Sequence, residues 1–132
     1  EVTQRRVGRL YDGWMPIGQA EQFAPGLEVV QQAATEVGRD ASSIATASYL
    51  TVALNDDVEA ADKTLNEYLA AYYPAPPAAM RAAQATYAGS AAGLVDWVRQ
   101  FVEAGSQHII IRCAGDHEQQ IEQVIDCLQS LR

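Results

Sequence analysis

Apolar, β-branched runs alternate along this chain with amphipathic helical stretches, and this alternation limits the fold more than any other feature. Two of the runs, 44–54 and 108–113, have the character of buried strands, and a shorter run at 12–17 is opened by Asp-Gly and closed by Pro-Ile-Gly. Strands that alternate with helices form parallel sheets through right-handed crossovers. The pattern predicts an α/β fold with about three parallel strands and flanking helices.

Helices are expected where apolar residues recur every three or four positions. The expected helices are the end of one at 1–11 and further ones at 26–37, 58–72, 91–104 and 116–131. Gly38 is the expected helix-ending residue after the second, and Asp116 is the expected N-cap of the last.

Segment 73–90 departs from this plan. Three prolines stand within four residues at 74–77, which breaks the preceding helix. We expect an irregular Pro/Ala-rich excursion within a single α/β unit that spans 1–132. An open sheet of three parallel strands has two bare edges, which a stable protein must cover or pair.

The charge balance limits the classes of partner. Seventeen acidic residues against nine basic ones give a net charge of −8, which disfavours nucleic acid and anionic membranes. The two cysteines lack the spacing of a metal site, so we expect no metal and reduced thiols, as in a cytoplasmic protein. The sequence shows neither a membrane-spanning run nor a signal peptide.

Three segments together carry a family resemblance. In residues 5–16 (RRVGRLYDGWMP) an arginine-containing helix precedes an Asp-Gly-Trp strand. In residues 93–112 a helix that ends in glycine precedes a His-Ile-Ile strand. Residues 128–132 (LQSLR) end a leucine-rich helix. This ordered set resembles the C-terminal part of the luciferase-like superfamily of flavin- or deazaflavin-dependent TIM-barrel oxidoreductases.

The resemblance implies a partial (β/α)8 barrel that contains family strands six to eight, about the last 40% of a barrel of ~250 residues. It implies a C-terminal fragment of a monooxygenase that uses reduced FMN and dioxygen, or of an enzyme that transfers hydride with a deazaflavin. The chain starts at Glu1 without methionine, which we interpret as processing or truncation. The 132-residue chain alone is expected to be inactive. Its expected ligand is a small-molecule substrate. Its expected protein partner is either the missing N-terminal part of the barrel or a further copy of itself, as in a dimer.

The active site of a TIM barrel lies at the carboxyl ends of its strands. This position selects Trp14, Met15, Pro16, Arg112 and His117 as candidate cofactor- or substrate-binding residues. An indole offers a flat apolar wall to a flavin or substrate, although tryptophan at such a position also serves as core. The catalytic residues stay unassigned, because the family's coenzyme contacts come largely from earlier strands.

Arg112 is the most suggestive candidate. It follows three isoleucines, and a cation there is costly to desolvate unless it faces an anion or a wet cleft. It could bind an anionic substrate or coenzyme phosphate, or it could form an ion pair with a carboxylate such as Asp116. His108 opens the same strand at the end away from the expected site and is interpreted as structural.

Two further interpretations remain open. The chain could be a non-enzymatic half-barrel that self-associates through its open edges and binds flavin weakly. It could also be an unrelated small α/β regulatory or binding domain, in which case the motif set is a coincidence.

Overall fold

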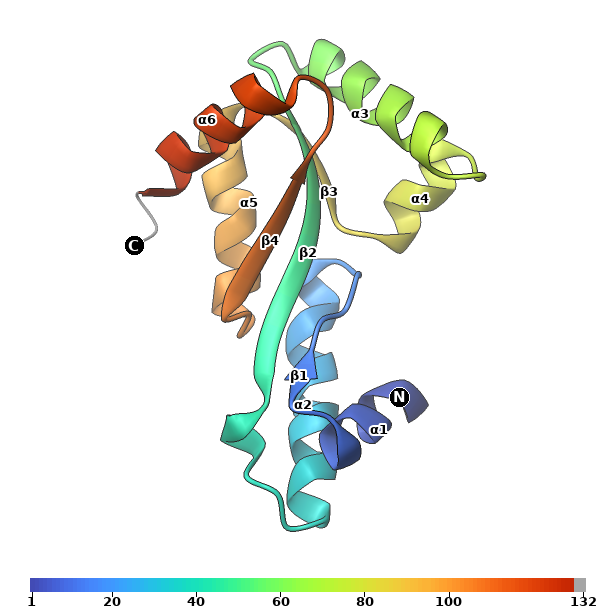
Figure 1. Cartoon of the computed structure of the whole chain (residues 1–132), viewed down its shortest axis with the longest axis vertical. Coiled ribbons are helices and arrows are strands. Elements are labelled where there is room, and N and C mark those ends of the chain that lie inside the picture. The colour runs from blue at the N-terminus through green and yellow to red at the C-terminus, as the bar shows by residue number, and fades with distance from the viewer. Residues whose placement is uncertain (130–132) are drawn as a thin grey trace.

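The computed structural model describes residues 1–129 (Figure 1). In chain order its elements are α1 (Val2–Leu10), β1 (Gly13–Trp14), α2 (Ala20–Glu36), η1 (Ala41–Ser43), β2 (Ala45–Leu54), α3 (Val58–Tyr72), α4 (Pro77–Ala83), β3 (Thr86–Gly89), α5 (Ala91–Glu103), β4 (His108–Cys113) and α6 (His117–Leu128). The predicted alternation of strands and helices is confirmed. The expected end of the last helix at Leu131, and most of the LQSLR segment, lie outside the described residues.

All strand pairs are parallel, and β2 takes part in each of them. It pairs with β1 at its start, with β4 along its middle and with β3 at its end. Odd-numbered residues of β2 direct their backbone hydrogen bonds to β1 and β3, and even-numbered ones direct theirs to β4. The strands β1 and β3 therefore share one edge of β2, and β4 lies on the other, as Figure 1 shows.

The segment 73–90 is more regular than predicted, and it supplies a fourth strand. Pro77 opens α4 instead of only breaking a helix, because a proline at the first helical position loses no hydrogen bond. Strand β3 pairs with Thr51–Leu54 of β2. Four residues are too few to show a periodicity, so this strand could be recognised only from its pairing.

The helix α2 begins at Ala20, six residues before the predicted start at Gly26. Pro25 and Gly26 have the appearance of a helix start, but both lie inside the helix. A side chain at Gly26 would lie 2.7 Å from the Trp14 ring, so glycine is needed where that ring packs on the helix. The expected helix end is confirmed, since Gly38 has a φ of 75°.

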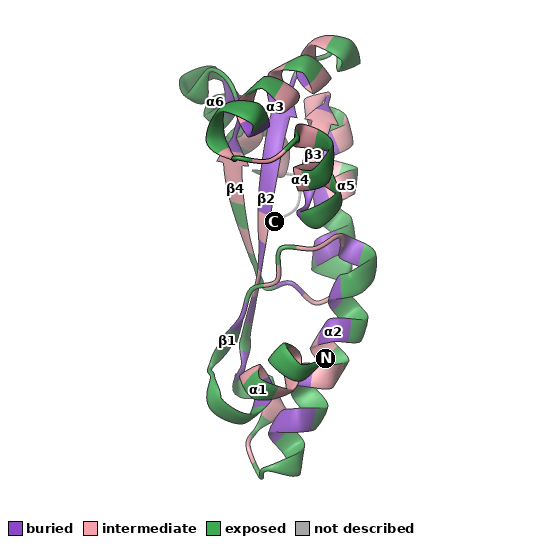
Figure 2. Ribbon diagram, turned by 90° about the vertical axis from the view of Figure 1, so that its right-hand side faces the viewer, coloured by how far each residue is buried: buried purple, intermediate pink, exposed green. Residues whose placement is uncertain are grey.

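The two faces of the sheet bury different helices. Alternate residues of β2, from Leu50 to Leu54, and Cys113 of β4 form one core cluster with Leu94, Val98 and Phe101 of α5. Figure 2 shows α2 and α5 on the same side of the sheet. On the opposite face, Ala53 and Ala114 pack against α3 through a second cluster.

This arrangement places α3 over the carboxyl end of the sheet face opposite α2 and α5. We call it the interior face. Lower on the same face Ile110 is 42% exposed, and among the described residues no strand pairs with the outer edge of β4. The sheet thus has two outer edges, one along β4 and one along β1 and β3, and neither pairs with a further strand among the described residues, as expected for an open sheet.

Candidate functional site

Arg112 lies on the interior face, beside the carboxyl end of the sheet. Its register partner on β2 is Thr51. Its neighbours Ile111 and Cys113 point to the opposite face, where they join the core under α5. The strand alternation therefore turns the guanidinium away from α5 and toward α3.

Two hydroxyls hold the guanidinium. Its Nη2 donates to Thr51 Oγ1 at 2.9 Å and to the Tyr73 hydroxyl at 2.9 Å, and its Nε donates to Thr51 Oγ1 at 3.3 Å. A longer contact of 3.5 Å joins Nη2 to Gln84 Oε1. The neutral acceptors fix the orientation of the cation without neutralising it.

Four tyrosine rings surround the same group. The distances from Arg112 Cζ to the ring centroids are 5.4, 5.3, 4.8 and 5.6 Å for Tyr49, Tyr68, Tyr72 and Tyr73, respectively. These distances lie within the range in which a ring face attracts a cation. We call the four residues the tyrosine cage.

The hydroxyls and ring faces stabilise the charge of Arg112, but no carboxylate among the described residues neutralises it. Among the described residues no Asp or Glu forms an ion pair with Arg112, and Asp116 instead caps α6 through the amides of Glu118 and Gln119. Burial opposes the charge, but the hydrogen bond to Tyr73 and the nearby phenol groups outweigh it and raise the pKa of Arg112. Arg112 is thus a permanent cation on a partly open face.

The cage was not predicted as a site. Neither its four tyrosines nor Gln84 are among the candidate residues selected from the sequence, and the helical spacing of Tyr68, Tyr72 and Tyr73 is typical of packing residues. The spacing of four between Tyr68 and Tyr72 does stack their rings, with centroids 5.8 Å apart. Only the fold brings these rings of α3 above a strand residue about forty positions later in the chain.

Trp14, Met15 and Pro16 border a different hollow, of about 530 Å³, between α1 and the start of α2. Trp14 is only 8% exposed and its ring lies 4.8 Å from that of Phe23, within the core under α2. Met15 is 51% exposed. Their proposed contact with a coenzyme or substrate stays a prediction.

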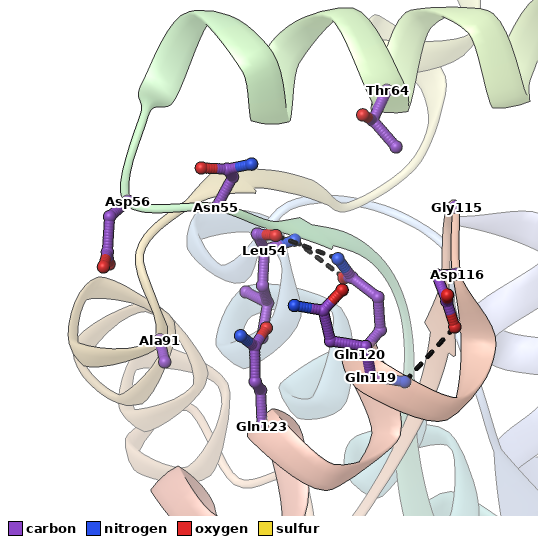
Figure 3. Close-up of a pocket in the computed structure, with 10 residues that line it drawn as sticks. All are labelled: Leu54, Asn55, Asp56, Thr64, Ala91, Gly115, Asp116, Gln119, Gln120 and Gln123. Carbon is purple, nitrogen blue, oxygen red and sulfur yellow. Dashed lines mark hydrogen bonds between the residues drawn. The ribbon is translucent and has the colours of Figure 1, made fainter.

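A polar pocket of about 450 Å³ lies at the carboxyl edge of the sheet, between the starts of α3, α5 and α6 (Figure 3). Its wall includes Asn55, Thr64 and the side chains of Gln119, Gln120 and Gln123. His117 is the exposed first residue of α6, next to this wall. A ligand-binding role for His117 remains a prediction, and His108 lies at the other end of β4 as expected.

Residues 1–129 contain no group of three or more His, Cys, Asp or Glu side chains that could hold a metal ion. Over the same range no helix has the length and apolar character needed to cross a membrane. Cys113 is a free cysteine, and burial raises the pKa of the thiols of both Cys113 and Cys127.

Comparison with known proteins shows which family the chain belongs to. The model of a family described as luciferase-like monooxygenase matches residues 1–132. The chain belongs to the luciferase-like monooxygenase family. No curated protein sequence matches the chain.

Solved structures share the fold at low sequence identity. A coenzyme F420-dependent tetrahydromethanopterin reductase from Methanopyrus kandleri is 15% identical with a TM-score of 0.69. The match covers 93% of this chain and 46% of the reductase. A long-chain alkane monooxygenase is 15% identical with a TM-score of 0.74, over 99% of this chain and 39% of that one. An F420-dependent secondary alcohol dehydrogenase is 14% identical with a TM-score of 0.72, and the match covers 98% of this chain and 44% of the dehydrogenase.

These likenesses confirm the predicted fold class. The luciferase-like chain has the parallel strands and flanking helices of part of a TIM barrel, and it spans less than half the length of the three structures. Because the helices of a TIM barrel form its outer ring, the face opposite α2 and α5, which carries Arg112, is the one expected to turn inward.

Proposed function

We propose that this luciferase-like chain supplies the C-terminal part of an oxidoreductase that uses FMN or a deazaflavin. The observation that carries the proposal is the family match over the whole chain, together with an uncompensated cation on the interior face. Two of the similar structures are named for coenzyme F420 and one is named as a monooxygenase. The reaction class is accordingly either monooxygenation with reduced FMN and dioxygen, or hydride transfer by a deazaflavin.

The interior face suits an anionic ligand. Flavins and deazaflavins carry phosphate and electron-rich ring atoms, and charges near these atoms tune and orient the coenzyme. Such a coenzyme supplies the redox step, while Arg112 would hold an anionic group of the substrate and the tyrosine cage would limit the access of water to that group. Contacts to the rest of the coenzyme would come from the remainder of the barrel.

The remainder of the barrel is the proposed partner. The outer edge of β4 presents unpaired backbone groups, and edges of this kind pair readily with another strand. The family's missing strands, on a preceding segment or a separate chain, would close this edge. The free thiol of Cys113 accords with a cytoplasmic location, which is likewise a proposal.

Coenzyme binding tests the proposal. The protein as it occurs in its native host would be isolated, its intact mass measured, and FMN and coenzyme F420 each titrated by fluorescence quenching. We expect a mass of roughly 30–40 kDa, as for a complete barrel, and saturable quenching by one coenzyme. A native form that binds neither coenzyme would contradict the proposal.

A self-associating half-barrel is the second candidate, and the exposed apolar residues favour it. Met15, Ile17 and Ile110 are large hydrophobic residues that the described structure leaves exposed. A native mass of 14.3 kDa together with a dimer in light scattering would support this candidate and exclude a barrel completed by another segment of the same chain.

A further inference from the structure

We propose that Arg112 and the tyrosine cage form a binding site for a carboxylate, and that the substrate therefore carries a carboxylic acid group. The assignment to a substrate rests on the proposed function. The anion site itself is a property of this chain.

The guanidinium of Arg112 has unused hydrogen-bonding capacity. Its Nε and Nη2 donate to Thr51 and Tyr73, whereas Nη1 has no hydrogen-bond partner among residues 1–129. A guanidinium that is held by neutral acceptors keeps its charge and its remaining N–H donors for an incoming anion. Hydrogen bonds between ionised partners are about twice as strong as neutral ones.

The charge at the site favours a ligand with a single negative charge. Arg112 contributes one positive charge, and the faces of the four rings of the tyrosine cage carry partial negative charge. One added negative charge is balanced by Arg112, whereas a phosphate dianion would leave an excess charge beside these faces. The net charge of −8 disfavours the dianion further.

Shape and access also favour a carboxylate. It is planar and hydrogen-bonds in the plane of the guanidinium, so it can accept from the N–H groups of Nη1. Tyr72, whose ring is nearest to the cation at 4.8 Å, is 62% exposed. The cage thus borders solvent at Tyr72, whereas Thr51, on the sheet beneath Arg112, is fully buried.

The test compares three probes on the intact protein: benzoate, its neutral analogue benzamide, and inorganic phosphate. Binding would be followed through the NMR signals of ring-labelled tyrosine. We expect benzoate to shift the signals of the cage and to bind at least tenfold more tightly than benzamide and phosphate. Equal binding of benzoate and benzamide, or tighter binding of phosphate, would overturn the inference.

Three variants make the test specific. R112M should abolish the preference for benzoate, Y72L should weaken benzoate binding several-fold, and R99M should leave it unchanged, because Arg99 pairs with Asp96 on the exposed side of α5. If R112M does not fold, R112K keeps the charge but loses the planar fork and should still reduce the preference. Unchanged benzoate binding in both R112K and Y72L would also overturn the inference.

Coenzyme titration separates this inference from the proposed function. Benzoate binding without FMN or F420 binding would retain the carboxylate site and reject the oxidoreductase. Coenzyme binding without a preference for benzoate would retain the oxidoreductase and reject the carboxylate site.

Discussion

The side-chain amide of Gln120 forms both of the hydrogen bonds that a strand neighbour would form with Leu54. The Leu54 amide donates to Gln120 Oε1 at 2.7 Å, and Gln120 Nε2 donates to the Leu54 carbonyl at 2.9 Å (Figure 3). The last backbone bond between this edge of β2 and the chain after β4 runs from Ala114 to Val52, at 2.7 Å. Gln120 thus continues the sheet by one step and ties α6 to the end of β2.

Removing this amide should destabilise the protein measurably. Gln120 is buried, and truncating it leaves a buried amide and carbonyl without partners, which costs about 1–3 kcal/mol in the free energy of unfolding. We expect Q120A to lower the urea midpoint accordingly. The matched control is Q119A, one residue earlier and exposed, which should change stability by less than about 0.5 kcal/mol. Equal effects of the two substitutions would show that the amide pairing contributes no stability.

The contact between α1 and α2 depends on Gly8. A methyl group there would lie 2.1 Å from the Val30 carbonyl oxygen, which belongs to a helix backbone and cannot move without shifting α2. We expect G8A to destabilise the protein by about 1–3 kcal/mol, as overpacking typically does. G13A is the control, since its added methyl would lie 3.7 Å from the nearest atom, an ordinary contact. Thermal unfolding of both variants measures the difference, and a stability of G8A close to that of G13A would refute this account of the helix contact.

The electrostatic coupling within the tyrosine cage is accessible through Tyr68. Burial raises the pKa of Tyr68, while the positive charge of Arg112 acts in the opposite direction. Replacing Arg112 by methionine removes the lowering influence, so the pKa of Tyr68 should rise further in R112M. A pH titration followed by the ring-carbon NMR signals of tyrosine measures this shift, with R99M as a control that should leave it unchanged. An unchanged or lowered pKa of Tyr68 in R112M would contradict the geometry of the cage.

Stability should fall in alkaline solution because of the buried thiol of Cys113. Burial raises the pKa of this thiol above its usual value of 9.0 in the folded protein. The unfolded chain therefore ionises first, so the stabilising contribution is complete below pH 9 and is lost as the pH rises through the higher pKa of the folded state.

The free energy of unfolding measured from pH 7.5 to 10 should thus decline more steeply for the native sequence than for C113A. The comparison concerns the slope with pH, because C113A also loses packing at every pH. C127A serves as a second reference, since burial raises the pKa of that thiol as well. Parallel slopes for the native protein and C113A would exclude Cys113 as a source of the decline.

Local sequence patterns determine much of this protein. Apolar runs and helical periodicity place most of the strands and helices, because each element must hide its own apolar face whatever its neighbours are. Asp116 and Gly38 act at helix ends as predicted, since capping depends only on the adjacent backbone. The ordered motifs were also sufficient to recognise the luciferase-like family, which the family model confirms.

Features that depend on distant partners were decided only by the tertiary structure. Strand β3 and the pairing of Gln120 with Leu54 exist because β2 presents unpaired backbone groups to them. Tyr68 and Tyr72 have the spacing of packing residues, and they become part of a site only where α3 crosses Arg112 on the interior face. The sequence by itself determined the family, the parallel α/β plan and Arg112 as a cation in need of a partner. Tertiary packing decided that this partner is a group of aromatic rings and hydroxyls instead of a carboxylate, because only the folded chain brings these side chains together.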